Sequence, residues 1–278
     1  MDEIGEASSS SFRAPPPPDP DRTVICIGDI HGLFSKLRRL WANLEAAVGG
    51  AAFETALVVF LGDYCDRGPE TREVLEFLVS LPARYPRQRH VYLCGNHEFA
   101  FAAFVGALPR PRRVAVLRHV GGVRGERGAR GLVQGEGYDA MHVQGRRWGG
   151  SIRARFDNKN MPYKGSTYDA APTFESYGVP MDPPLAKAVP DDHKKFLHDL
   201  VWVHEEENVP VDTDEGRICC KLIAVHAGLL KSKGVDERLK LLRARDTRLP
   251  KVQELSGRQD VWEIPKVMRR SVFQSPFS

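Results

Sequence analysis

The chain has 278 residues, of which 42% are hydrophobic and 27% charged, and its formal net charge is +4. These values are ordinary for a globular protein, and the charge is too small to argue for nucleic-acid binding. The sequence contains no run of about 18 apolar residues, so we expect no membrane helix. The polar N-terminus lacks the apolar core of a secretion signal, so we do not expect secretion. The five cysteines form no CxxC pair typical of structural zinc, so we expect a reducing compartment, the cytosol or nucleus.

The N-terminal residues 1–21 contain a serine run and the prolines Pro15 to Pro18. This composition cannot bury a core and is typical of a disordered or polyproline tail. We expect a passive tail, with a proline-binding partner as the alternative.

Strand and helix patterns alternate from residue 22 to about residue 106. Hydrophobic runs predict buried strands over 23–27, 56–61 and 90–94, with Cys26 and Cys94 in the core. Apolar residues at helical spacing predict helices over 33–47, 70–81 and 99–108. This alternation indicates an α/β fold.

The pattern breaks at residues 109–134, where seven arginines are scattered among glycines. We expect a solvated insertion or an error in the gene product, with a basic arm that attracts phosphorylated ligands as the alternative. Residues 135–190 are rich in glycine, tyrosine and proline and predict a long loop above the sheet. Farther on, the sequence predicts a helix over 191–204, a strand over 218–225, a helix over 235–244 and a basic tail over 266–278.

A polar motif follows each of the first three predicted strands. The motifs are Gly28-Asp29-Ile30-His31-Gly32, Gly62-Asp63-Tyr64-Cys65-Asp66-Arg67-Gly68-Pro69 and Gly95-Asn96-His97-Glu98. Open α/β sheets place their sites at the carboxyl ends of strands, so we expect these side chains to meet. Carboxylate, amide and imidazole ligands from such loops can hold two divalent metals, and two metals are a device for hydrolysing phosphate esters.

Several polar residues of these motifs, together with His226 after the later predicted strand, have expected roles. Asp63 can bridge both ions with its two oxygens, and Asp29, His31, Asn96 and His226 can supply the other metal ligands. The metals would lower the pKa of a shared water so that hydroxide forms at neutral pH. His97 is the candidate general acid with Asp66 as its orienting partner, and Arg67, with Asn96, can bind phosphate oxygens.

These motifs resemble the signature of the phosphoprotein-phosphatase group of calcineurin-like metallophosphoesterases. In that group GDxHG, GDxxDRG and GNHE precede a late histidine in an HGG-like turn. The resemblance implies a β-sandwich flanked by helices, with manganese, iron or zinc in the site. It also implies that Asp29, His31 and Asp63 hold the first metal and that Asp63, Asn96 and His226 hold the second.

The resemblance continues beyond the motifs. The stretches GDYCDRGPET, GEGYDAMHVQGRRW, YKGSTYDA, TFESYGVP, AVPDDHKKFL and KLIAVHAGL are similar to the plant Rhizobiales-like phosphatases, a branch associated with phosphotyrosine. The similarity covers residues 22–108 and 135–265. We therefore expect one metallophosphoesterase domain over 22–265, interrupted by the atypical Arg/Gly-rich insertion at 109–134.

The sequence departs from the family pattern in three places. His226-Ala227-Gly228 replaces HGG, and residues 109–134 do not resemble the family. The family also carries a further metal-binding histidine after the segment that matches Leu255 to Pro265, and this sequence has no histidine beyond His226. We therefore expect a C-terminally truncated sandwich that lacks its last strands, and a weakened second metal site.

Three functions follow from these observations. The first is a metal-dependent protein phosphatase that prefers phosphotyrosine in a phosphorylated protein or peptide. The second is a truncated isoform, noncatalytic or weakly active, that binds phosphorylated partners. The third is a dinucleoside-polyphosphate hydrolase, since one scaffold serves several substrates. The sequence predicts neither the metal nor the oligomeric state.

Overall fold

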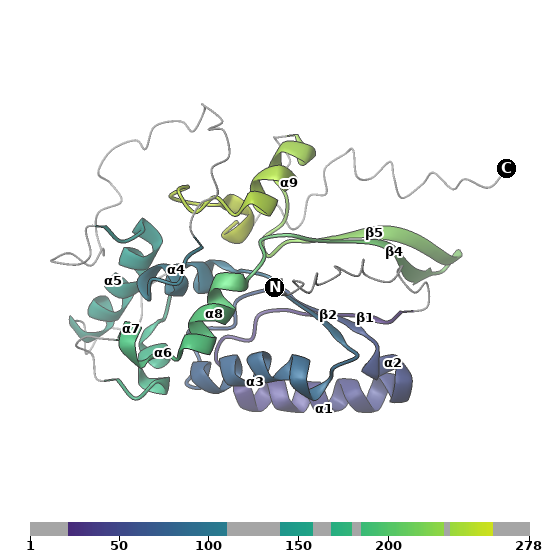
Figure 1. Cartoon of the computed structure of the whole chain (residues 1–278), viewed down its shortest axis with the longest axis horizontal. Helices are drawn as coiled ribbons and strands as arrows, with labels where there is room; N and C mark the ends of the chain where they lie inside the picture. Colours follow the sequence, from purple (N-terminus) through teal and green to yellow (C-terminus); the bar gives the residue numbers. More distant parts are fainter. Residues whose placement is uncertain (1–21, 110–139, 158–167, 180–184, 231–233, 258–278) are drawn as a thin grey trace, which may run out of the picture.

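The computed structural model describes residues 22–109, 140–157, 168–179, 185–230 and 234–257 (Figure 1). The predicted tails at 1–21 and 266–278, and the insertion at 109–134 apart from Pro109, lie outside these residues. None of the helices in these five ranges is long and apolar enough to cross a membrane.

Three parallel strands form the first sheet, in the order β1 (Val24–Ile27), β2 (Leu57–Phe60) and β3 (Arg89–Tyr92). They confirm the three predicted strands. All four side chains of the central strand β2 are buried, as expected for a strand covered on both faces. The connecting helices are α1 (Phe34–Val48), α2 (Gly50–Glu54) and α3 (Thr71–Arg84).

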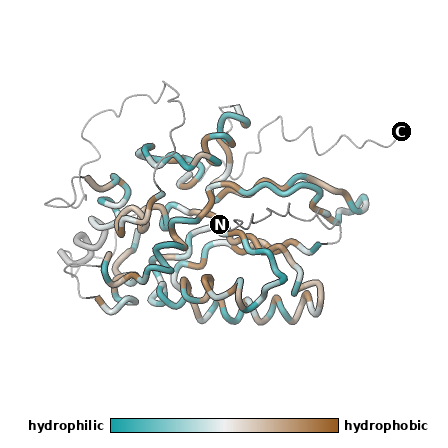
Figure 2. Tube along the Cα trace, in the orientation of Figure 1, coloured by the Kyte–Doolittle hydropathy of each residue, from teal (hydrophilic) through white to brown (hydrophobic). Residues whose placement is uncertain are grey.

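The first layer of the core lies between this sheet and its helices. Leu37 and Trp41 of α1 are buried, and the Trp41 ring stacks on Phe60 of β2 with the ring centres 6.2 Å apart. Apolar and polar segments alternate along α1 and α3 in Figure 2, as in helices with one buried face.

A second sheet lies on the other face of the first. It is an antiparallel hairpin of β4 (His204–Thr213) and β5 (Gly216–Ala224) with an irregularity between Glu206 and Val209. Leu57, Val59 and Leu93 of the first sheet pack with Ala224 in a separate apolar cluster. Figure 1 shows the hairpin above β1 and β2, with α1 and α3 below them. Two facing sheets with flanking helices agree with the predicted sandwich.

Helices replace the long loop that was predicted over residues 135–190. These helices are α5 (Val143–Asp157), α6 (Ala171–Ser176) and α7 (Leu185–Ala188), whereas α4 (Asn96–Phe104) corresponds to the helix predicted over 99–108. The loop prediction was wrong because glycine serves close helix packing here. A Cβ atom on Gly145 would lie 2.8 Å from the backbone nitrogen of Phe104, so only glycine lets α5 approach α4 this closely.

The predicted helix over 191–204 is too long. Helix α8 (Asp191–Asp199) ends early because Val201 forms an isolated parallel bridge with Leu93, the residue after β3. The predicted helix over 235–244 is confirmed as α9 (Val235–Ala244), and β5 matches the predicted strand over 218–225. Within the ranges given above, the last element is the short 3-10 helix η1 (Gln253–Leu255), and no strand follows β5.

Burial was predicted for both strand cysteines, and the structure confirms it for one of them. Cys94 is buried, but Cys26 is exposed. Its strand β1 is the edge of the three-stranded sheet and shows alternating burial, so one face of the strand is uncovered at this position.

Candidate metal and phosphate site

The loops that follow β1 and β2 are joined by their backbones. The N–H groups of Ile30 and His31 both donate to the Asp63 carbonyl over 2.9 Å, and the Gly68 N–H donates to the His31 carbonyl over 3.0 Å. A Cβ atom on Gly68 would lie only 2.4 Å from that carbonyl oxygen. Glycine is therefore required where the loops cross.

The same loops hold polar residues in left-handed backbone conformations. Among the non-glycine residues with positive φ in the described parts of the chain, five of seven belong to these two motifs: Asp29 (25°), His31 (46°), Asp63 (56°), Asp66 (69°) and Arg67 (68°). Such conformations cost about 1–3 kcal/mol each and gather at functional sites. The strained backbone therefore indicates that these two loops form a functional site.

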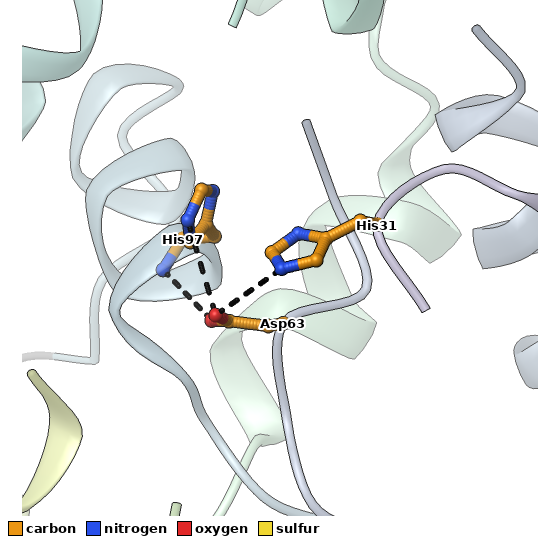
Figure 3. Close-up of side chains that lie close together, drawn as sticks. All are labelled: His31, Asp63 and His97. Carbon is orange, nitrogen blue, oxygen red and sulfur yellow. Dashed lines mark hydrogen bonds and ion pairs between the residues drawn. The ribbon is translucent and has the colours of Figure 1, made fainter. Parts of the chain in front are cut away.

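The Asp63 carboxylate lies at the centre of the site, and Figure 3 shows it between the imidazoles of His31 and His97. Its Oδ2 is 3.6 Å from Nε2 of His31 and 3.8 Å from Nε2 of His97, and its Oδ1 is 3.4 Å from Nε2 of His226. Asp63 is 5% exposed. Burial alone would raise its pKa, but the hydrogen bond from His226 and the neighbouring imidazoles lower the pKa to about 2.

Hydrogen bonds fix which nitrogen of two histidines faces Asp63. Nδ1 of His31 lies 3.0 Å from the Cys65 carbonyl, and Nδ1 of His226 lies 2.7 Å from the Leu61 carbonyl. A carbonyl only accepts, so each Nδ1 carries a hydrogen and each Nε2 is directed at the centre. Histidine ligands of metals are oriented in this way.

The donor set fits divalent metals. The ligand atoms of His31, Asp63 and His97 lie within 4.8 Å of one another, and so do those of Asp29, Asp63 and His226. Both groups share Asp63, and nitrogen with carboxylate oxygen suits manganese, iron or zinc. Burial lowers the pKa of His226, but its contacts with Asp63 outweigh this effect and raise the pKa to about 9. The surroundings of Nε2 therefore favour a positive charge.

The grouping differs from the predicted ligand sets. Asp29, which is largely exposed, groups with Asp63 and His226, although its Oδ2 also lies 4.0 Å from Nε2 of His31, and His31 groups with His97. Asn96 is the first residue of α4 and stands next to His97. The structure thus brings the side chains of Asp29, His31, Asp63, His97 and His226 together, whereas the ligand role of Asn96 and the division of the residues between two ions stay predictions.

His97 and Asp66 form a buried pair. Nδ1 of His97 lies 2.7 Å from Oδ2 of Asp66. Burial lowers the pKa of His97, but the hydrogen bond and charge of Asp66 outweigh it and raise the pKa above its usual value. Arg67 lies beside this pair, with Nη1 2.8 Å from Nε2 of His31 and Nη2 3.4 Å from Nε2 of His97. Its guanidinium therefore lies at the metal ligands, where phosphate would bind.

Three residues of the site were not predicted. The buried Glu98 accepts hydrogen bonds from four backbone N–H groups, those of Asp63, Tyr64, Cys65 and Gly95. Its signal was its place in the GNHE motif. Trp148 and Thr173 bind Asp66 from 82 and 107 residues away, and no local pattern could have indicated them.

Comparison with known families identifies the chain. The model of the calcineurin-like phosphoesterase family matches residues 22–175, more than half of the sequence. The chain therefore belongs to this family of phosphate-ester hydrolases, in agreement with the resemblance seen in the motifs and with the mixed α/β fold.

Three solved structures that the chain is similar to are protein tyrosine phosphatases. A cold-active enzyme from a psychrophilic Shewanella species is 29% identical over 29% of this chain and 26% of its own, with a TM-score of 0.25. A second structure of a cold-active enzyme is 31% identical over 29% and 25%, with a TM-score of 0.25. A point mutant is 30% identical over 30% and 26%, with a TM-score of 0.26. The aligned region spans about a quarter of each of these proteins.

Proposed function

We propose that the chain is a metal-dependent phosphomonoester hydrolase that acts on phosphorylated proteins or peptides and prefers phosphotyrosine. The observation that supports hydrolysis best is the buried Asp63 carboxylate, onto which Nε2 atoms of His31, His97 and His226 converge. The Asp63 carboxylate with the imidazoles of His31 and His226 forms a ligand set for cations, and His97 lies beside it.

Two divalent cations, manganese, iron or zinc, would supply an activated water and neutralise phosphoryl charge. Asp63 would contribute an oxygen to each, with His31 and Asp29 on one side and His226 and Asn96 on the other. A cation on Nε2 of His31 would replace the hydrogen bond from Arg67. The guanidinium would then be free to donate to two phosphate oxygens.

His97 would act as the general acid. As water oxygen bonds to phosphorus, the bond from phosphorus to the leaving oxygen breaks and that oxygen keeps the electron pair. The proton on Nε2 of His97 neutralises it, while Nδ1 stays bound to Asp66. The raised pKa of His97 is consistent with a nitrogen that carries a proton to donate.

The preference for phosphotyrosine rests on the sequence similarity of residues 135–178 to the Rhizobiales-like branch. A location in the cytosol or nucleus is part of the same proposal. It is supported by the five cysteines, all of which are free thiols.

The test is release of phosphate from a phosphotyrosine peptide with and without manganese. A phosphoserine peptide of the same sequence and a dinucleoside tetraphosphate are the competing substrates. We expect manganese-dependent release that is fastest from phosphotyrosine. Asp63→Asn should abolish it, whereas Asp212→Asn, a change at a largely exposed carboxylate, should not.

Other outcomes would favour the alternatives. Faster cleavage of the dinucleotide would indicate a nucleotide hydrolase. Peptide binding without phosphate release, together with fewer than two bound ions per chain, would indicate a noncatalytic isoform.

A further inference from the structure

We propose that Trp148 of α5 and Thr173 of α6 are positioning residues that fix the Asp66 carboxylate and thereby aim Nε2 of His97 at the leaving oxygen. This inference rests on the proposed function, in which His97 is the general acid. In the proposed function, the side chains of Trp148 and Thr173 contact neither the cations nor the phosphate, and this inference gives them a role.

Both oxygens of Asp66 are held from outside the motif that contains it. Oδ2 accepts hydrogen bonds from Nδ1 of His97 over 2.7 Å and from Nε1 of Trp148 over 2.9 Å. Oδ1 accepts from the Thr173 hydroxyl over 2.7 Å. Asp66 is 0% exposed, so water does not replace these donors. With both oxygens engaged from different helices, the carboxylate cannot turn without losing a charge-assisted hydrogen bond.

The two donors are themselves fixed. The fully buried Trp148 ring stacks between Phe101 and Phe174, with ring centres 5.1 and 5.3 Å away and interplanar angles of 24° and 22°. The Thr173 hydroxyl is also an acceptor for the backbone N–H of Asp66 over 3.1 Å. Thr173 therefore contacts Asp66 at both backbone and side chain.

His97 has little freedom of its own once Asp66 is fixed. Its ring is 1% exposed and stands edge-on to Tyr168, with the ring centres 5.2 Å apart. The hydrogen bond at Nδ1 sets the direction of Nε2, which faces Oδ2 of Asp63 at 3.8 Å. Misplacement of a catalytic group by about 1 Å can cost up to about 10²-fold in rate. Release of Asp66 would remove the hydrogen bond that sets the direction of Nε2.

The chemistry provides a readout that a merely structural role would not change. Proton donation by His97 matters most when the leaving oxygen is strongly basic. Phenyl phosphate releases a phenoxide as basic as that of tyrosine, with a pKa of about 10. 4-Nitrophenyl phosphate releases a much weaker base that departs without help. A variant with a misdirected His97 should therefore lose activity on the first substrate and keep it on the second.

The experiment measures kcat and KM on both substrates for the full chain with manganese. The variants are Trp148→Phe, which removes the N–H and keeps a ring, and Thr173→Val, which removes the hydroxyl and keeps the shape. We expect kcat on phenyl phosphate to fall by about 10-fold, a part of the 10²–10⁴-fold that general acid catalysis contributes. We expect a fall of less than about 2-fold on 4-nitrophenyl phosphate, with KM unchanged.

Two controls separate positioning from folding. Thr173→Ser restores the hydroxyl and should restore the ratio of the two kcat values. Trp202→Phe alters another buried tryptophan, which packs edge-on against Phe99 and lies outside the Asp66 hydrogen bonds, and should leave the ratio unchanged. The proton NMR signal of the His97 Nδ1–H should shift in Trp148→Phe and not in Trp202→Phe.

The outcomes distinguish failure of the positioning role from failure of the proposed function. Equal losses on both substrates, or a serine variant no better than the valine variant, would overturn the positioning role while leaving the proposed function intact. If the unaltered chain with manganese hydrolyses neither substrate, the proposed function fails and this inference fails with it.

Discussion

The Glu98 carboxylate accepts a hydrogen bond of 2.8 Å from the backbone N–H of Asp63, 35 residues earlier in the chain. Glu98 lies in the first turn of α4, and Asp63 lies in the loop after β2. A helix that supplies Asn96 and His97 is thereby tied to the loop that supplies the central carboxylate.

Substitution Glu98→Gln should destabilise the protein by about 2–4 kcal/mol, because the amide replaces an oxygen acceptor with a donor that faces backbone N–H groups. The measurement is urea unfolding followed by circular dichroism. Glu76→Gln is the matched control, since Glu76 is half exposed and pairs with Arg72 at the surface. That change should cost less than about 1 kcal/mol. Equal costs for the two variants would contradict the role given to Glu98.

Substitution Gly95→Ala should disrupt the site. A Cβ atom at this position would lie 2.2 Å from Oδ1 of Asp63 and 2.7 Å from its backbone nitrogen. The carboxylate would have to move, so we expect manganese binding, measured by calorimetry, to weaken by at least about 10-fold, with a stability cost of about 1–3 kcal/mol. Gly234→Ala, where nothing lies within 4 Å of the new atom, should bind manganese normally. Normal binding in both variants would show that Asp63 tolerates displacement.

The lowered pKa of His90 should make the stability of the protein depend on pH. Burial lowers its pKa in the folded protein from 6.5 to about 4. The unfolded chain therefore binds more protons between these values, so the contribution of His90 to stability is complete above pH 6.5 and is lost as pH falls toward 4. Substitution His90→Gln removes this titration. The free energy of unfolding should consequently fall less steeply between pH 6.5 and 4 in the variant than in the unaltered chain. Parallel curves would contradict the low pKa.

The buried ion pair of Arg238 and Glu254 should stabilise the turn that carries His226. Arg238 binds Glu254 through two hydrogen bonds, and the Glu254 carbonyl accepts the N–H of Ala227 over 2.8 Å. Substitution Glu254→Met leaves the Arg238 charge buried without a partner and should cost about 3–5 kcal/mol in thermal or urea unfolding. The double variant Arg238→Met with Glu254→Met should recover part of that loss. A double variant less stable than the single one would contradict this account.

Local pattern was sufficient to predict the part of the fold that carries the motifs. The hydrophobic runs at 23–27, 56–61 and 90–94 overlap β1, β2 and β3 and have polar residues directly after them, so the strands and the loop residues could be identified together. The meeting of Asp63 with His31 and His97 follows from parallel neighbouring strands, which bring their carboxyl ends to one edge.

Long-range packing accounts for what the sequence did not predict. In α5, the Trp148 ring stacks on Phe101 of α4 and Gly145 lets the two helices approach closely, so these contacts depend on a second helix and not on the local sequence of α5. The early end of α8 depends on the pairing of Val201 with Leu93, more than 100 residues earlier. Trp148 and Thr173 contact Asp66 from two separate helices. The spacing of residues along the sequence does not predict such contacts.

The backbone hydrogen bonds that join Ile30, His31 and Gly68 across the first two loops have a consequence for ligand entry. They hold the imidazole and carboxylate groups on a common rigid frame before any cation arrives. Little conformational entropy is then lost when the ion is captured. Association should accordingly show a small heat-capacity change, unlike a centre that has to fold around its ion.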